Sequence, residues 1–116
     1  MIIHDRIANP LNGRYYSEYP TLANEENYVR IRYGDVGAET SEQIHLRQTL
    51  DATRTTRVIT SDTQAPFKTR GFVLIGDGLF QIGPLTRELI NPRALQKRYR
   101  TGMALTEVDN PLQLKV

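Results

Sequence analysis

Histidine, cysteine, serine and paired carboxylates carry most catalysis and metal binding, and this chain offers few of them. It has two histidines, His4 and His45, and no cysteine. Neither histidine stands at a metal-ligand spacing from a partner, and disulfides and thiolate metal sites both need cysteine. The serines, at positions 17, 41 and 61, lie in no G-x-S-x-G motif. These residues predict neither a nucleophile nor a metal centre.

The stretch Gly76-Asp77-Gly78 has the look of a phosphate-loop fragment, but its surroundings do not fit one. A phosphate loop needs a wider glycine spacing, a lysine and a following helix, whereas an apolar strand pattern follows here. The acidic residues are spread over predicted turns and termini, with no two at a defined spacing: Asp35, Glu39, Glu42, Asp51, Asp62 and Asp77. We therefore expect a protein that is not an enzyme and has no cofactor.

Arginine dominates the basic residues, since 12 of the 15 are Arg in a chain whose net charge is only +2. Genomic base composition explains such a bias as well as an interface does, in which Arg pairs with carboxylates or phosphates. Arg30 and Arg32 alternate along one predicted strand and Arg57 lies in the next. We expect these three to contact a neighbouring subunit, facing acids such as Glu39, Glu42 or Asp62.

A second basic cluster lies in NPRALQKRYR, residues 91–100. Basic and aromatic side chains on a small barrel also suit nucleic-acid binding, although nucleic-acid-binding domains usually carry a larger positive excess. Pro92 excludes one continuous helix here and favours a strand at 85–90 followed by a helical turn. Ala94, Leu95 and Tyr99 are expected to face inward from that turn.

Short strands at close spacing indicate a mainly β fold: a small antiparallel β-barrel or sandwich with one or two short helices, with α+β as the alternative. Period-two patterns predict strands at 28–33 and 55–60 and a hairpin at 71–83 that turns at Gly76-Asp77-Gly78. A helix is predicted near 40–52, with Leu46 and Leu50 on one face. The inward side chains of the hairpin are predicted to be Phe72, Leu74, Phe80 and Ile82, although both faces are apolar enough for burial.

The chain has the length of one domain, 1–116. Residues 1–27 lack periodicity and predict an irregular arm, residues 28–100 the barrel, and residues 101–116 a tail with a weak strand pattern at 112–116. Tyr15, Tyr16 and Tyr19 in residues 1–27 either pack against the barrel of their own chain or contact a partner. No apolar stretch reaches the roughly 20 residues of a membrane span, so a soluble protein with no membrane partner is expected.

The order of features resembles the head-closure, or stopper, proteins of tailed-phage head–tail connectors, also called head–tail joining proteins. The residues that carry the resemblance are RVITSDTQAPFKTRGFVLIGDGLFQIGPL (57–85), preceded by YVRIRYGDVGAETSEQIHLRQ (28–48). They read as strand, glycine turn, capped helix, strand, PFK turn and hairpin. Together they cover about half of the chain.

The resemblance implies a structural virion protein that is monomeric alone and forms a ring, assembled in the host cytoplasm. The ring closes the DNA-filled capsid, and its partners are copies of itself, the portal or adaptor protein, tail proteins and the packaged DNA. Tyr15, Tyr16 and Tyr19 then form a docking element, and a channel-facing segment carries Asp35, Glu39, Glu42 and Arg47. The alternatives are another connector component, an adaptor or tail-completion protein, or a nucleic-acid-binding small barrel.

Overall fold

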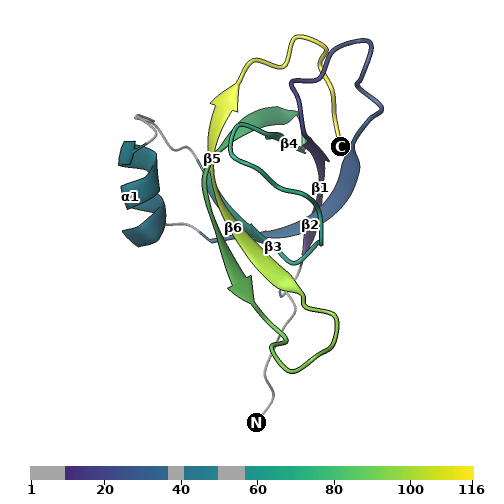
Figure 1. Ribbon diagram of the computed structural model, residues 1–116. Coiled ribbons are helices and arrows are strands. Elements are labelled where there is room, and N and C mark those ends of the chain that lie inside the picture. Colours follow the sequence, from purple (N-terminus) through teal and green to yellow (C-terminus); the bar gives the residue numbers. More distant parts are fainter. Residues whose placement is uncertain (1–9, 37–40, 50–56) are drawn as a thin grey trace.

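A computed structural model describes residues 10–36, 41–49 and 57–116, in which six strands close an antiparallel barrel (Figure 1). Around the barrel the strands follow the order β1-β2-β3-β6-β5-β4, and β4 pairs with β1 to close it. The strands are β1 (Leu11–Tyr16), β2 (Val29–Asp35), β3 (Arg57–Ser61), β4 (Phe72–Ile75), β5 (Gly78–Leu89) and β6 (Tyr99–Val108). The prediction of a small, mainly β barrel with a short helix is confirmed.

The barrel interior is one apolar cluster to which all six strands contribute. A loop between β3 and β4 adds Phe67, whose ring meets the ring of Tyr15 edge-on at 5.0 Å between centroids. The Tyr15 hydroxyl donates to the carbonyl of Pro66 at 2.9 Å, so its polar atom is satisfied. A Cβ at position 71 would lie 2.9 Å from the Tyr15 ring, so Gly71 permits this packing. The predicted PFK turn therefore plugs the barrel with its phenylalanine.

The predicted hairpin is confirmed, with Ile75 paired to Gly78 across a two-residue turn. Gly76 has a φ of 59°, the left-handed conformation that such a tight turn requires. The predicted facing of β4 is partly wrong. Val73 packs in the interior with Phe80 and Ile82, whereas Phe72 and Leu74 belong to a second cluster outside the barrel. All four residues of β4 are buried, so its sequence does not distinguish the two faces.

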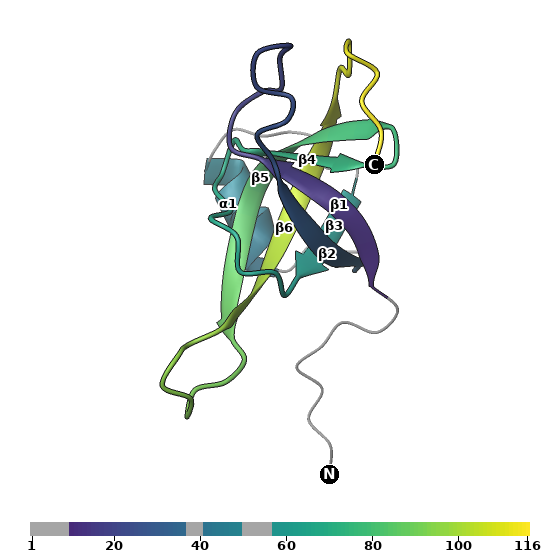
Figure 2. The same ribbon diagram turned by 90° about the vertical axis from the view of Figure 1, so that its right-hand side faces the viewer.

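The second apolar cluster lies on the outer face of β1, β4 and β5 and comprises Tyr16, Phe72, Leu74 and Leu79. The loop 17–28 and the C-terminal segment 109–116 lie together at this end of the barrel (Figures 1 and 2). Tyr28 and Leu114 from these segments pack against the cluster. Their side chains extend the buried apolar volume beyond the barrel interior.

Hydrogen bonds tie this covering layer to the barrel. The Tyr19 hydroxyl donates to the carbonyl of Asp109 at 2.8 Å, and the Tyr16 hydroxyl donates to the carbonyl of Glu25 at 2.7 Å. The amide of Val116 donates to the carbonyl of Gly76 at 2.8 Å, which holds the chain end against the β4–β5 turn.

Two predicted boundaries are wrong. Residues 11–16, predicted as part of an irregular arm, form β1, which is held on both sides by β2 and β4. Residues 101–108, predicted as part of a tail, lie in β6, which pairs with β3 and β5. Residues 112–116 form no strand. Both strands contain glycine and polar residues, and their pairing with distant segments outweighs weak local propensity.

A bulge separates the barrel part of β5 from an outer part. Ile82 pairs with Leu105 and Leu85 with Met103, so Gly83 and Pro84 together oppose one residue of β6. A bulge bends its strand, and it is a position where proline is tolerated. Beyond it β6 still pairs with β3 as far as Thr101, and from there β5 and β6 continue as a two-stranded ribbon that projects from the barrel (Figures 1 and 2). We call this ribbon and its loop, residues 87–100, the arm.

The described helix α1 (Ser41–Thr49) lies between β2 and β3 in sequence and packs against β5. Gln43 is its buried side chain, while Ser41, Glu42, Ile44 and His45 are exposed. The prediction of a helix near 40–52 is confirmed over 41–49. Its remaining positions lie outside the described residues, as does Leu50, and the side chain of Leu46 is not described.

Candidate interaction surfaces

The part of the chain that the structure describes was searched for clusters of metal-ligating side chains. No group of three or more histidine, aspartate or glutamate side chains in that part is placed to hold a metal ion. His45 is exposed on α1, and Gly76-Asp77-Gly78 forms the hairpin turn. Among these residues no helix has the length and apolar character needed to cross a bilayer. The surfaces with distinctive chemistry are therefore charged and apolar patches.

A basic strip runs along the outer wall formed by β1 and β2. Arg30 and Arg32 are exposed, and Arg30 pairs in register with Arg14 across the two strands. The guanidinium carbon of Arg14 lies 4.3 Å from the ring centroid of Tyr28, a cation–π contact. Arg30 is thus exposed beside Arg14, whose guanidinium stacks on Tyr28.

Arg57 makes its ion pair within the chain. Its guanidinium donates two hydrogen bonds to the Asp35 carboxylate, at 2.7 and 2.9 Å, in a bidentate geometry. These bonds lower the pKa of Asp35 and raise the pKa of Arg57. The predicted contact of Arg57 with acids of a neighbour, and of Asp35 with a channel, is therefore corrected, because the two side chains satisfy each other.

The tyrosine prediction is also corrected. Tyr15 and Tyr16 are 2 % and 1 % exposed and fill the interior and outer clusters respectively, so they are not available to a partner. Burial raises the pKa of both phenols. Tyr19 is partly exposed, at 37 %, and its ring covers Phe72 edge-on at 5.3 Å between centroids. Tyr15 thus stabilises the barrel interior and Tyr16 the outer cluster, instead of forming a docking element, while Tyr19 lies partly exposed over Phe72.

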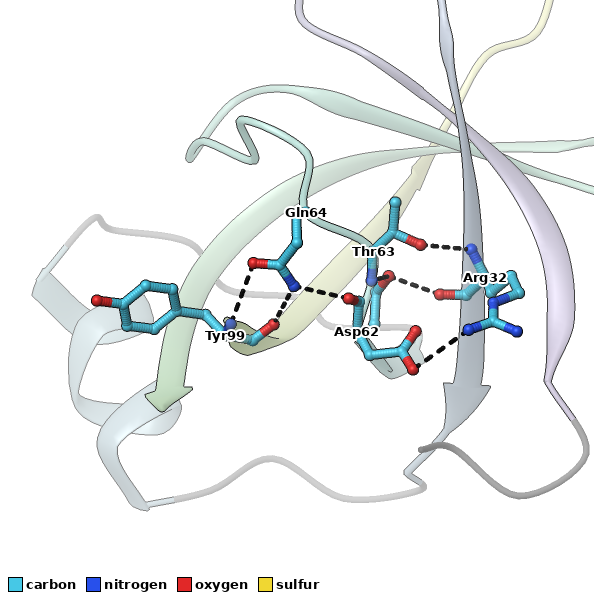
Figure 3. A network of polar contacts seen from close by, with 6 residues as sticks. Arg32, Asp62, Thr63, Gln64 and Tyr99 are labelled. Carbon is cyan, nitrogen blue, oxygen red and sulfur yellow. Dashed lines mark hydrogen bonds and ion pairs between the residues drawn. The ribbon is translucent and has the colours of Figure 1, made fainter. Parts of the chain in front are cut away.

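A polar network links β2 to the base of the arm (Figure 3). Arg32 contacts the buried Asp62 carboxylate at 3.5 Å, and the Arg32 amide donates to the Thr63 hydroxyl at 2.9 Å. The Gln64 side chain then pairs with the backbone of Tyr99. Its amide nitrogen donates to the Tyr99 carbonyl at 2.8 Å, and its amide oxygen accepts from the Tyr99 amide at 3.1 Å.

This network has two consequences. Gln64 supplies both hydrogen bonds that a neighbouring strand would otherwise give to Tyr99, so it fixes the arm where the arm leaves the barrel. Asp62 is 3 % exposed and pairs with Arg32 of its own chain, so the prediction that Asp62 meets an arginine of a neighbour is wrong. Arg32 keeps a half-exposed side chain, at 53 %.

The loop at the tip of the arm, residues 91–98, is organised around Asn91. The Asn91 side chain donates to the Gln96 carbonyl at 2.9 Å and accepts from the Arg98 amide at 2.5 Å. The amide of Ile90 donates to the Arg98 carbonyl at 3.0 Å, and the ammonium of Lys97 donates to the Pro92 carbonyl. These bonds close the loop across its width. The tip is therefore ordered before it meets any partner.

Leu95 stands on this ordered loop with its side chain fully exposed, at 105 %. The prediction that Leu95 and Tyr99 face inward is wrong, since Tyr99 is also exposed at 39 %. The predicted helical turn at Pro92 is a hydrogen-bonded turn from Asn91 to Ala94. The arm carries five basic residues and one acid: Arg87, Arg93, Lys97, Arg98, Arg100 and Glu88. The basic cluster is visible in the sequence, but its place on a ribbon that extends beyond β3 is not.

The opposite end of the barrel has the opposite charge. Six carboxylates lie in the loop 17–28, the β4–β5 turn and residues 107–109: Glu18, Glu25, Glu26, Asp77, Glu107 and Asp109. Lys115 is the single basic residue in these segments and the C-terminal segment that follows them. Leu22 in the loop is 80 % exposed. We call this region the acidic end, a feature that the sequence analysis missed because its members are far apart in the chain.

The remaining predicted channel residues belong to the helix and its flanks. Glu42 is exposed in the first turn of α1. Arg47 lies in α1, and its side chain is not described. Glu39 lies outside the described residues. The prediction of a channel-facing segment therefore stays a prediction for these residues.

The chain was compared with protein-family models, with curated proteins and with solved structures. No family model matched, and no curated protein or solved structure did either.

Proposed function

We propose that this protein is a structural component of a tailed-phage head–tail connector, forming a ring that closes the DNA-filled capsid and offers the tail an attachment platform. The observation that carries the proposal is the closed barrel with α1 inserted between β2 and β3. That architecture agrees with the small barrel implied by the resemblance of residues 28–48 and 57–85 to head-closure proteins. An adaptor or tail-completion protein of the same connector is the nearest alternative.

The chemistry of the surface supports a binding role. The described residues with distinctive chemistry lie outside the barrel, in a basic strip, a projecting arm and an acidic end. Two of the three arginines predicted to contact a neighbour already have carboxylate partners in the same chain, Arg32 with Asp62 and Arg57 with Asp35. Arg30 thus becomes the wall residue with which we expect a neighbouring protein to pair.

Co-sedimentation with phage capsids tests the proposal. Purified protein is incubated with DNA-filled, tail-less capsids that carry a connector and, as the control, with capsids that lack the portal. We expect binding to the first and not to the second, together with retention of the packaged DNA. Arg30→Glu should weaken binding at least tenfold, while Arg30→Lys, which keeps the charge, should weaken it less. Equal binding to both kinds of capsid would contradict the proposal.

The second candidate function is nucleic-acid binding by the basic strip and the arm. The observation in its favour is that Arg30 and Arg32 on the wall and Arg87, Arg93 and Lys97 on the arm are exposed on one small barrel. Binding of short duplex DNA, with an affinity that falls steeply as salt rises, together with indifference to capsids, would favour this function over the connector.

A further inference from the structure

We propose that the arm tip of one copy docks on the acidic end of a second copy, so that copies join head to tail. This inference deepens the proposed function and rests on it, since a ring needs a contact between two different patches of one subunit. The arginine–acid pairs predicted along the wall do not provide it, because Arg57 and Asp62 each pair with another residue of the same chain. The two ends of the barrel supply a replacement.

The charges of the two ends are complementary. The arm has five basic residues against one acid, and the acidic end has six carboxylates against one lysine. Glu18, Glu26, Asp77 and Asp109 are exposed, as are Arg93 and Lys97 on the arm tip. Opposite charges facing one another across an interface speed association and set its register.

Each charged end also presents a leucine that is at least 80 % exposed, Leu95 on the arm tip and Leu22 in the loop 17–28. Single exposed leucines are common, so the leucines alone would carry no argument. Here Leu95 lies on the loop that carries the exposed Arg93 and Lys97, and Leu22 lies on the loop that carries the exposed Glu18 and Glu26, so the two leucines accompany charges of opposite sign. Contact between them would remove both side chains from water, with charged pairs at the rim, which is the usual arrangement of a specific interface.

The arm is suited to docking because it is already ordered. Gln64 fixes its base and Asn91 closes its tip, so little conformational entropy is lost when a partner binds. The arm and the loop 17–28 lie at opposite ends of the barrel (Figure 2). One molecule therefore cannot satisfy both patches itself, and a chain of such contacts either closes as a ring or continues as a filament.

A second copy fits the tip better than nucleic acid does. Phosphates would pair with Arg93 and Lys97 but would leave Leu95, at the centre of the tip, without an apolar partner. The acidic end provides carboxylates and Leu22 together.

Cysteine cross-linking tests the contact, because the natural chain has no cysteine. The variant Leu22→Cys/Leu95→Cys is treated with a short bismaleimide, free at high concentration and bound to connector-bearing capsids. We expect dimers and larger covalent species that decrease as salt rises. The control is Leu11→Cys/Leu95→Cys, in which Leu11 is exposed at 48 % on the barrel wall, and it should cross-link at least fivefold less.

Charge reversal gives the decisive test of the contact. Arg93→Glu/Lys97→Glu placed in the Leu95→Cys chain, or Glu18→Lys/Glu26→Lys placed in the Leu22→Cys chain, should each abolish cross-linking to an unreversed partner. Mixing the two reversed chains should restore it. Cross-linking that matches the Leu11 control, or that ignores both reversals, would overturn the inference.

The two proposals fail in different ways. Capsid binding without the Leu22–Leu95 cross-link would overturn the head-to-tail contact and leave the connector function standing. Cross-linking without capsid binding would overturn the connector function alone. Loss of the cross-link together with duplex DNA binding that Arg93→Glu/Lys97→Glu abolishes would assign the arm to nucleic acid instead.

Discussion

The two ends of the barrel differ in how far an apolar cluster on one and an apolar side chain on the other are exposed to solvent. At the acidic end, Tyr16 and Phe72 lie outside the barrel but are buried, because Tyr19 and the C-terminal segment cover them. On the arm, Leu95 is equally apolar and is fully exposed, although its loop is as well hydrogen-bonded as the covering layer. The covered cluster at the acidic end contributes to stability, whereas Leu95 on the arm, like the exposed Leu22 at the acidic end, is a side chain for which we propose a binding role.

The largest expected effect is on the free energy of unfolding, from a substitution in the covered apolar cluster at the acidic end. Phe72→Ala removes a ring that is 8 % exposed, and we expect it to lower the free energy of unfolding by about 3–5 kcal/mol, as for a core phenylalanine. Phe80→Ala in the interior, with the same exposure, is the benchmark and should cost about the same, 3–5 kcal/mol. Denaturant melts measure both. A loss below about 1 kcal/mol for Phe72 alone would mean that the covering layer does not bury the outer cluster.

The next effect is on stability at alkaline pH. Burial raises the pKa of Tyr15, Tyr16 and Tyr33 above the ordinary 10.0. The folded state therefore holds these protons at pH values where the unfolded chain has released them. This contribution is complete below the unfolded pKa and is lost as pH rises through the folded values. We expect the denaturant midpoint to fall above pH 10, and a phenolate absorbance titration to show three late groups. Release of all six phenols near pH 10 would contradict the burial.

A smaller effect is expected at the base of the arm. Gln64→Ala removes both side-chain bonds to Tyr99, and we expect it to lower the free energy of unfolding by about 1 kcal/mol. Amide exchange should speed up in residues 87–101 more than in β1 or β4. Gln96→Ala, on the exposed arm tip, is the matched control. Uniform acceleration across the barrel would show that Gln64 supports the whole fold and not the arm in particular.

The smallest effect on stability should come from Leu95, a residue that we expect to contribute to assembly. Leu95→Ser changes a fully exposed side chain, so the free energy of unfolding should move by less than about 0.5 kcal/mol. Association between copies, measured by sedimentation at high concentration, should nevertheless fall severalfold, because the tip loses its exposed apolar side chain. A clear loss of stability, or unchanged assembly, would remove the contrast between the two ends.

The sequence predicted the parts of the fold that are encoded locally. The β4–β5 hairpin followed from two apolar runs around Gly76-Asp77, and β2 from its alternation. The strands β1 and β6 were missed because each is defined by pairing with distant neighbours. The facing of β4 could not be predicted, because all four of its residues are buried, two inside and two outside.

The candidate surfaces were less predictable than the fold. The basic cluster of the arm was visible in the sequence, but Leu95 was assigned to the core. Its exposure depends on β5 and β6 extending beyond β3, whose last pair with β6 is Ser61 with Thr101. The acidic end joins segments far apart in the chain, such as Glu18 and Asp109, so no local pattern shows it. Arg57 and Asp35 were expected to meet other molecules because the sequence does not reveal that they meet each other.

A cryo-electron microscopy map of connector-bearing capsids saturated with this protein tests the account most directly. The account predicts a ring of barrels between the portal assembly and the tail site, with residues 91–98 of each copy against the loop 17–28 of the next. Barrels in a ring with every arm tip directed into solvent would contradict the head-to-tail contact. Capsids without added density at the connector would contradict the proposed function itself.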